Sequence, residues 1–168
     1  MTVWGVQSGT DPVAAALDAQ AGRERVAMGS QKRIVLIAHD NMKDELLAWA
    51  RFNRDTLAEH ELFATGTTGA LLAAQLDLPV TRFLSGPLGG DQQVGAGLAE
   101  GRLDLVIFFW DPLQPQPHDV DVKALLRIAV VCNCPIACNR ATADFLLSSP
   151  LLATSYERIV AVQERFPS

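Results

Sequence analysis

The run SGPLGGDQQVG at 85–95 places one acid, Asp91, directly after a pair of glycines. Glycines let the backbone turn sharply, so the acid follows a turn and opens a helix predicted over 91–101. An acid at that position can cap the helix, and its negative charge interacts favourably with the positive end of the helix dipole. It can also serve as a base beside a bound substrate. The other residues able to share a site with Asp91 decide between these roles.

Imidazoles, carboxylates and a lysine occur in two further runs. AHDNMKDELL holds His39, Asp40 and Lys43 within five residues, and PHDVDVKALL holds His118 and Asp121 before a predicted helix. A lysine in the first turn of a helix opposes the helix dipole, which favours pairing with a bound anion; a solvated lysine is the alternative. The acids could be helix caps only. Together with Asp91, these groups are typical of sites that move protons next to a carbonyl.

The run ATGTTGALLAAQ at 64–75 places two threonines between Gly66 and Gly69 at the start of a predicted helix. Unpaired backbone N–H groups at a helix start, with hydroxyls beside them, form an anion site that suits phosphate. Ordinary capping by threonine is the alternative. The run fits neither G-x-x-x-x-G-K-[ST] nor G-x-G-x-x-G, so it does not indicate a nucleoside triphosphate or a dinucleotide.

Metal and acyl-transfer chemistry have weak support. His39 and His118 are far apart in the sequence and lack the short spacing of a histidine pair that binds metal. No serine or cysteine occupies a G-x-S-x-G motif. The three cysteines all lie in CNCPIAC at 132–138, without a suitable fourth ligand nearby, which predicts buried, reduced thiols.

From Arg33 onward, short aliphatic runs alternate with amphipathic stretches, and five such repeats predict an α/β domain. The expected architecture is a single open, mostly parallel five-stranded sheet with helices on both faces, Rossmann-like in its layers. Residues 32–168 would form this domain, and 1–31 an N-terminal extension with a short helix near 11–20. The predicted strands cover 33–40, 61–66, 80–85, 103–111 and 135–139, and the predicted helices cover 42–60, 67–77, 91–101, 121–133 and 141–149.

The polar candidates follow the predicted strands. In open α/β sheets, ligands bind beyond the carboxyl ends of the strands. We therefore expect one site at this edge, because four strands are followed in turn by His39–Asp40, Thr65–Thr68, Ser85–Gly86 and Asp111–Pro112.

Composition narrows the class of protein. The 168 residues fit one domain, and a net charge of −5 provides no general basic field for nucleic acid or an anionic membrane. The apolar run at 105–110 is far too short for a membrane span, which needs about 20 residues. The first 30 residues lack the basic and apolar regions of a secretory signal, so a cytoplasmic protein is predicted.

Several runs together resemble the methylglyoxal synthase family over about residues 33–150: AHDNMK, ATGTTG, LSGPLGGDQQVG, VIFFWDPL, PHDVDVKALLR and CNRATADFLLSSP. The resemblance implies a lyase that converts dihydroxyacetone phosphate to methylglyoxal and inorganic phosphate, with no metal or organic cofactor. Proton removal would give an enediolate that then eliminates phosphate. A homohexamer inhibited cooperatively by phosphate is also implied. The alternative is a regulatory ligand-binding module of the same fold.

The resemblance also implies residue roles. Asp91 matches the catalytic base, His39 and His118 would lie near the substrate oxygens, and Asp40 and Asp121 match supporting acids. The C-terminal Arg158 and Arg165 both fit the place of an arginine associated with the family's site, so neither is chosen. The residues expected to bind the phosphorylated substrate, besides the two histidines, are Lys43, Thr65, Gly66, Thr67, Thr68, Ser85 and Gly86.

Overall fold

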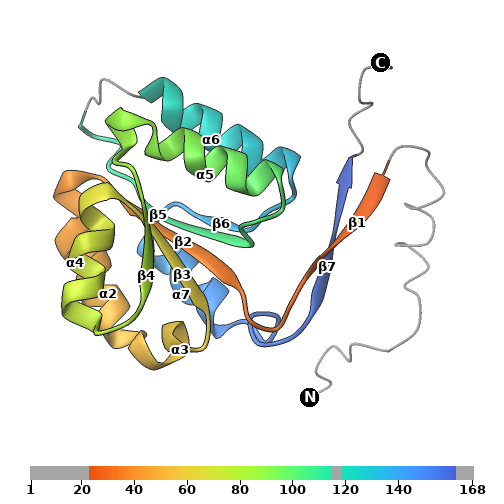
Figure 1. Ribbon diagram of the computed structural model, residues 1–168, viewed down its shortest axis with the longest axis horizontal. Coiled ribbons are helices and arrows are strands. Elements are labelled where there is room, and N and C mark those ends of the chain that lie inside the picture. Colours follow the sequence, from red (N-terminus) through yellow and green to blue (C-terminus); the bar gives the residue numbers. More distant parts are fainter. Residues whose placement is uncertain (1–22, 115–118, 162–168) are drawn as a thin grey trace.

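The computed structural model describes residues 23–114 and 119–161. Five parallel strands form the central sheet in the order β4-β3-β2-β5-β6 (Figure 1). This arrangement confirms the predicted five-stranded parallel sheet. The strands are β2 (Arg33–Ala38), β3 (Glu61–Thr65), β4 (Val80–Phe83), β5 (Leu105–Phe109) and β6 (Ile136–Ala137).

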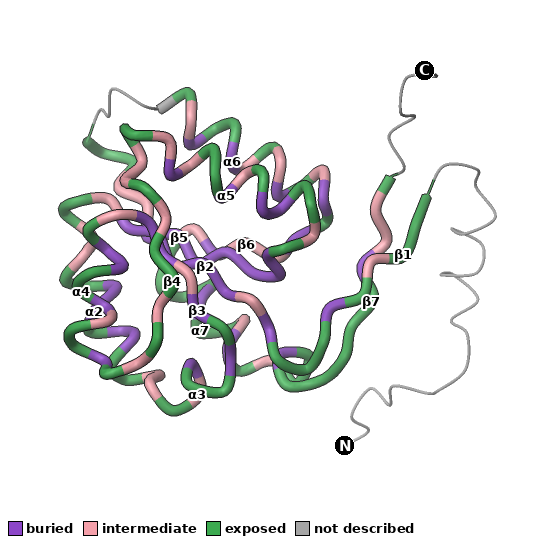
Figure 2. The backbone as a smooth tube through the Cα atoms, viewed as in Figure 1, coloured by how far each residue is buried: buried purple, intermediate pink, exposed green. Residues whose placement is uncertain are grey.

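Helices cover both faces of this sheet, as predicted. Alternate residues of β2 point to opposite faces, so Ile34 and Leu36 join one hydrophobic cluster while Val35 and Ile37 join the other. Figure 2 shows the buried strands β2 and β5 between the helices. The first cluster contains side chains of α2 (Lys43–Phe52), α3 (Arg54–Ala58), α4 (Gly66–Leu76) and α7 (Arg140–Ser148), and the second contains side chains of α5 (Gly90–Ala99) and α6 (Asp119–Val131).

The single helix expected over 42–60 is two helices, α2 and α3, preceded by the 3₁₀ turn η1 (Asp40–Met42). The chain leaves helical geometry at Asn53, where φ is −99° and ψ is 16°. The Asn53 side-chain amide, through Nδ2, donates a hydrogen bond to the Trp49 carbonyl at 2.9 Å. A side chain that bonds to nearby backbone competes with the helix ladder, which accounts for the break.

A second sheet of two antiparallel strands lies beside the main sheet (Figure 1) and was not predicted. It pairs β1 (Arg23–Met28) with β7 (Tyr156–Ala161), in a register that places Met28 opposite Tyr156. Arg25 and Glu157 form an ion pair across these strands at 2.9 Å. β1 thus lies within residues 1–31, where the sequence predicted an extension and a short helix but named no strand. The helix expected near 11–20 lies outside the described residues.

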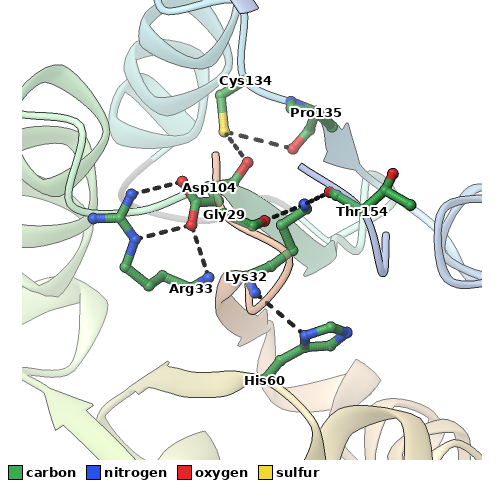
Figure 3. A network of polar contacts seen from close by, with 8 residues as sticks. All are labelled: Gly29, Lys32, Arg33, His60, Asp104, Cys134, Pro135 and Thr154. Atoms are coloured by element: carbon green, nitrogen blue, oxygen red, sulfur yellow. Dashed lines mark hydrogen bonds and ion pairs between the residues drawn. The ribbon is translucent and has the colours of Figure 1, made fainter. Parts of the chain in front are cut away.

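Polar contacts of Lys32, just before β2, link the segments after β1 and before β7 to the residue before β3 (Figure 3). The Lys32 ammonium donates to the carbonyls of Gly29 and Thr154, and the Lys32 amide donates to His60 Nδ1 at 3.3 Å. His60, at the end of the helix predicted over 42–60, is buried. Burial lowers the pKa of both Lys32 and His60.

An ion pair inside the same region joins β2 to the segment before β5 (Figure 3). The Asp104 carboxylate accepts three hydrogen bonds from Arg33: from the amide at 2.9 Å, from Nε at 2.9 Å and from Nη2 at 2.7 Å. Asp104 is 1% exposed, so its charge is compensated where water cannot reach it.

Two of the three cysteines are buried, as predicted. Cys132 and Cys134 are buried, Cys138 is half-buried, and all three are free thiols. Burial raises the pKa of Cys134 to about 12, so its thiol is neutral at physiological pH. Among the described residues, no helix has both the length and the apolar character of a membrane span.

Candidate active site

A cavity of about 610 Å³ lies at the carboxyl edge of the central sheet. Its walls come from the segments after β2, β3 and β4, as the sequence predicts, and Phe108, Val122 and Leu125 add apolar surface. The predicted site residues that line it are His39, Asp40, Lys43, Thr65, Thr67, Thr68, Ser85, Gly86 and Asp91.

The turn from β3 into α4, residues 65–68, lines the cavity, and we call it the phosphate turn after the ligand predicted for it. Thr65 occupies the N-cap position of α4, yet its side chain makes no capping hydrogen bond. Simple capping therefore does not explain this threonine. The first N–H groups of a helix lack partners within the helix, and threonine hydroxyls beside them add donors for an anion.

Gly66 is predicted to bind substrate, and it shapes the turn rather than lining the cavity. Its φ is +37°, and its amide donates to the Leu84 carbonyl at 3.1 Å. A Cβ added at Gly66 would lie 2.6 Å from Ser85 Cα, closer than real atoms approach. Only glycine lets the phosphate turn pack directly against Ser85.

Lys43 connects the first segment of the cavity to the phosphate turn. Its ammonium donates to Asp40 Oδ1 at 2.5 Å and to Thr67 Oγ1 at 2.6 Å. The Lys43 side chain is 19% exposed, which argues against the solvated alternative. The hydrogen bond from Lys43 lowers the pKa of Asp40, which makes Asp40 a weaker proton acceptor than an ordinary aspartate.

Asp91 lies in the first turn of α5, and Gly89 occupies the N-cap position. The structure therefore does not support the role of Asp91 as the capping residue. The Gly90 amide donates to the Ser85 carbonyl at 2.9 Å, which closes the turn before the helix. A Cβ at Gly86 would lie 3.0 Å from Asp91 Oδ2, so the carboxylate lies against the Gly86 backbone.

The ring of His39 is fixed from two sides. Its Nδ1 accepts a hydrogen bond from the Asp111 amide at 3.3 Å, and its ring meets Phe108 edge-on with centroids 5.1 Å apart. In a neutral imidazole whose Nδ1 accepts, Nε2 carries the hydrogen and donates. Asn41 holds Asp111 through a 3.1 Å hydrogen bond from its amide, and this bond lowers the pKa of Asp111.

Other predicted residues lie elsewhere. Asp121 lines a neighbouring groove of about 310 Å³ between α5 and α6, which it shares with Asp91. Gln92 Nε2 donates to Asp121 Oδ1 at 3.1 Å. Arg158 is buried beside Cys134, away from the cavity. His118 and Arg165 lie outside the described residues.

Sequence reasoning missed the glutamines that follow Asp91. Besides the contact of Gln92 with Asp121, Gln93 Oε1 accepts a hydrogen bond from the Leu84 amide at 2.8 Å. The signal was present in the GGDQQ run, because two polar residues directly after a candidate base can hold its surroundings in place.

Within residues 23–114 and 119–161, no three His, Cys, Asp or Glu side chains gather as a metal site would require. The side chains around the cavity are instead suited to an anion, through the phosphate turn and Lys43, and to proton transfer, through Asp91 and His39.

The fold and cavity thus define an open α/β domain whose cavity suits an anionic ligand beside a carboxylate. Comparisons with known proteins make the class specific, because residues 45–138 match the family model of the MGS-like domain. The methylglyoxal synthase of Leptospira interrogans is 60% identical over 137 residues, covering 82% of this chain and 93% of that protein. The methylglyoxal synthase of Saccharophagus degradans is 56% identical over 140 residues, covering 83% and 91%.

A solved structure agrees with these relatives. The crystal structure of methylglyoxal synthase from Elizabethkingia anophelis NUHP1 has a TM-score of 0.78 and 48% sequence identity, covering 84% of this chain and 91% of that one. The chain belongs to the methylglyoxal synthase family. Relatives carrying this name favour an enzyme over the regulatory module.

Proposed function

We propose that the chain converts dihydroxyacetone phosphate to methylglyoxal and inorganic phosphate, as a carbon–oxygen lyase acting on phosphates. One observation carries the proposal: a single cavity brings the Asp91 carboxylate, the phosphate turn and Lys43 together. The phosphate turn and Lys43 would bind the phosphate group, so that the carbonyl end of this short substrate meets Asp91 and His39. Ser85 and Gly86 lie between these two halves and would contact the phosphate.

Proton removal is the first chemical step. Asp91 takes a proton from the hydroxyl-bearing carbon beside the carbonyl, and the electrons of that C–H bond form the enediolate. A hydrogen bond from His39 Nε2 to the carbonyl oxygen stabilises the negative charge that develops there. Asp91 therefore need not be a strong base. His118 and Asp121 are proposed to support the same step, as their match to the family implies.

Elimination is the second step. The C–O bond to phosphate breaks and its electrons leave with the phosphate, while the enediolate becomes the enol of methylglyoxal, which takes up a proton on carbon. This C–O bond must stand roughly perpendicular to the enediolate plane to overlap its π electrons. The residues that hold the phosphate thus set the direction of the reaction as well as the affinity.

Family membership supports three further proposals. We infer that the chain acts in the cytoplasm, that it assembles as a homohexamer, and that inorganic phosphate inhibits it cooperatively. Inorganic phosphate would bind at the phosphate turn, where the phosphate group of the substrate binds. The division of the chain into an extension (1–31) and a domain (32–168) stays a prediction.

The test of the proposed activity is to incubate the purified full chain with dihydroxyacetone phosphate and follow the substrate by carbon NMR. We expect its signals to be replaced by those of methylglyoxal. Substrate that binds without being converted would instead support the regulatory module.

Replacing Lys43 with methionine is expected to weaken the binding of inorganic phosphate about ten- to a hundredfold. A hydrogen bond to a charged group contributes roughly 1.5–3 kcal/mol, and methionine keeps the length of the side chain without its charge. Isothermal titration calorimetry measures the Kd. Lys123→Met on α6, at an exposed position, is the control and should leave the Kd unchanged. If Lys43→Met bound phosphate with the wild-type Kd, Lys43 would have no part in phosphate binding.

A further inference from the structure

The backbone of Leu84 lies at the junction between the two halves of the cavity. Its carbonyl accepts the hydrogen bond from Gly66, which begins α4, at 3.1 Å. Its amide donates to Gln93 Oε1, on α5, at 2.8 Å. Leu84 also directly precedes Ser85, one of the proposed phosphate contacts. One residue thus joins the phosphate turn to the helix that bears Asp91.

Gln93 is held firmly enough to act through this contact. Its backbone N–H donates to the Gly89 carbonyl at 3.1 Å, in the first turn of α5. Gly90, beside it in that turn, packs so closely on Leu84 that an added Cβ would lie 2.1 Å from the Leu84 carbonyl oxygen. The Gln93 side chain therefore spans a fixed, short distance between α5 and the end of β4.

The Leu84 amide depends on this side chain for its partner. The ladder between β3 and β4 ends with Thr65 opposite Phe83, so Leu84 lies one residue beyond it. The Gln93 oxygen accepts the hydrogen bond of this amide, and without it the amide would need another partner such as water. Loss of the Gln93 acceptor would then let the chain at Ser85 and Gly86 shift relative to α5.

We propose that Gln93 is a positioning residue that fixes the place of Ser85 and Gly86 relative to Asp91. It thereby controls how much of the enediolate eliminates phosphate and how much takes the proton back. This inference rests on the proposed function. Proton removal needs Asp91 and a polarised carbonyl, whereas elimination also needs the C–O bond held perpendicular to the enediolate. A shift of Ser85 and Gly86 therefore impairs elimination more than it impairs the return of a proton.

The test compares Gln93→Met, which keeps the length but loses the acceptor, with Gln93→Glu, which keeps an acceptor oxygen. The reaction is run in D₂O. The exchange ratio is the amount of deuterium incorporated into the remaining dihydroxyacetone phosphate divided by the amount of methylglyoxal formed. We expect Gln93→Met to lower kcat about tenfold, more than it raises KM, and to raise deuterium exchange per product severalfold. Gln93→Glu should retain most of the wild-type kcat and keep an exchange ratio close to that of the wild type.

Gln75→Met, at an exposed position of α4, is the matched control and should match the wild type. An unchanged exchange ratio in a folded Gln93→Met variant would overturn the inference, even if kcat fell, because a merely structural role does not alter the ratio. Equal ratios in the Met and Glu variants would overturn it too. A wild-type chain that neither exchanges deuterium nor forms product would overturn the proposed function itself, together with this inference.

Discussion

Replacing Asp91 with asparagine should lower kcat about 10²- to 10⁴-fold, the usual contribution of a positioned general base. Asparagine has nearly the same shape, so it keeps the packing against Gly86 but cannot accept the proton. The Kd for inorganic phosphate should stay close to that of the wild type, because Asp91 acts on the carbon end of the substrate. Initial rates of phosphate release, together with calorimetry, measure both quantities.

Asp55→Asn, on the surface of α3 with its side chain fully exposed, is the control for this change. It should leave kcat and the phosphate Kd as they are. A near-normal rate for Asp91→Asn would mean that another acid is the base, and Asp121 in the neighbouring groove is the nearest candidate of the predicted site.

Replacing Gly66 with alanine is expected to damage both the fold and the site. Its φ of +37° disfavours a side chain, and the added Cβ would lie 2.6 Å from Ser85 Cα. The strain should lower the free energy of unfolding by about 1–3 kcal/mol. Because the phosphate turn and Ser85 must separate, the Kd for inorganic phosphate should rise at least about tenfold, by loss of one or more charged hydrogen bonds. Urea unfolding and calorimetry check the two effects.

Gly95→Ala on α5 is the matched control for added bulk. Its Cβ would meet nothing closer than 3.8 Å, and alanine favours a helix over glycine by about 0.5–1 kcal/mol. This variant should therefore be as stable as the wild type or more stable. A Gly66→Ala protein with wild-type stability and phosphate affinity would show that the close packing of Gly66 on Ser85 has no functional consequence.

The central sheet could be predicted because its signals are local. The buried runs of β2 and β5 are nearly continuous in apolar residues, and polar residues follow these strands where the fold gathers them at one edge. Most site residues could be named because the GGDQQ and ATGTTG runs resemble a known family. Their roles stay predictions that the variants above test.

The features that escaped prediction depend on long-range contacts. β1 carries charged residues without a clear alternation, and it becomes a strand by pairing with β7, more than a hundred residues later in the chain. The burial of His60 depends on the Lys32 backbone, which is 28 residues earlier in the chain and donates to its ring. The role of Gln93 could not be predicted because it depends on a contact with the Leu84 backbone, which only the folded chain brings about.

The most direct test of the account is the stoichiometry of products from dihydroxyacetone phosphate, measured with the full chain in the presence of a metal chelator. We expect equal molar amounts of methylglyoxal and inorganic phosphate from the wild type, and a loss of both products with Asp91→Asn. Phosphate release without methylglyoxal, or binding of dihydroxyacetone phosphate with neither product formed, would contradict the proposed activity.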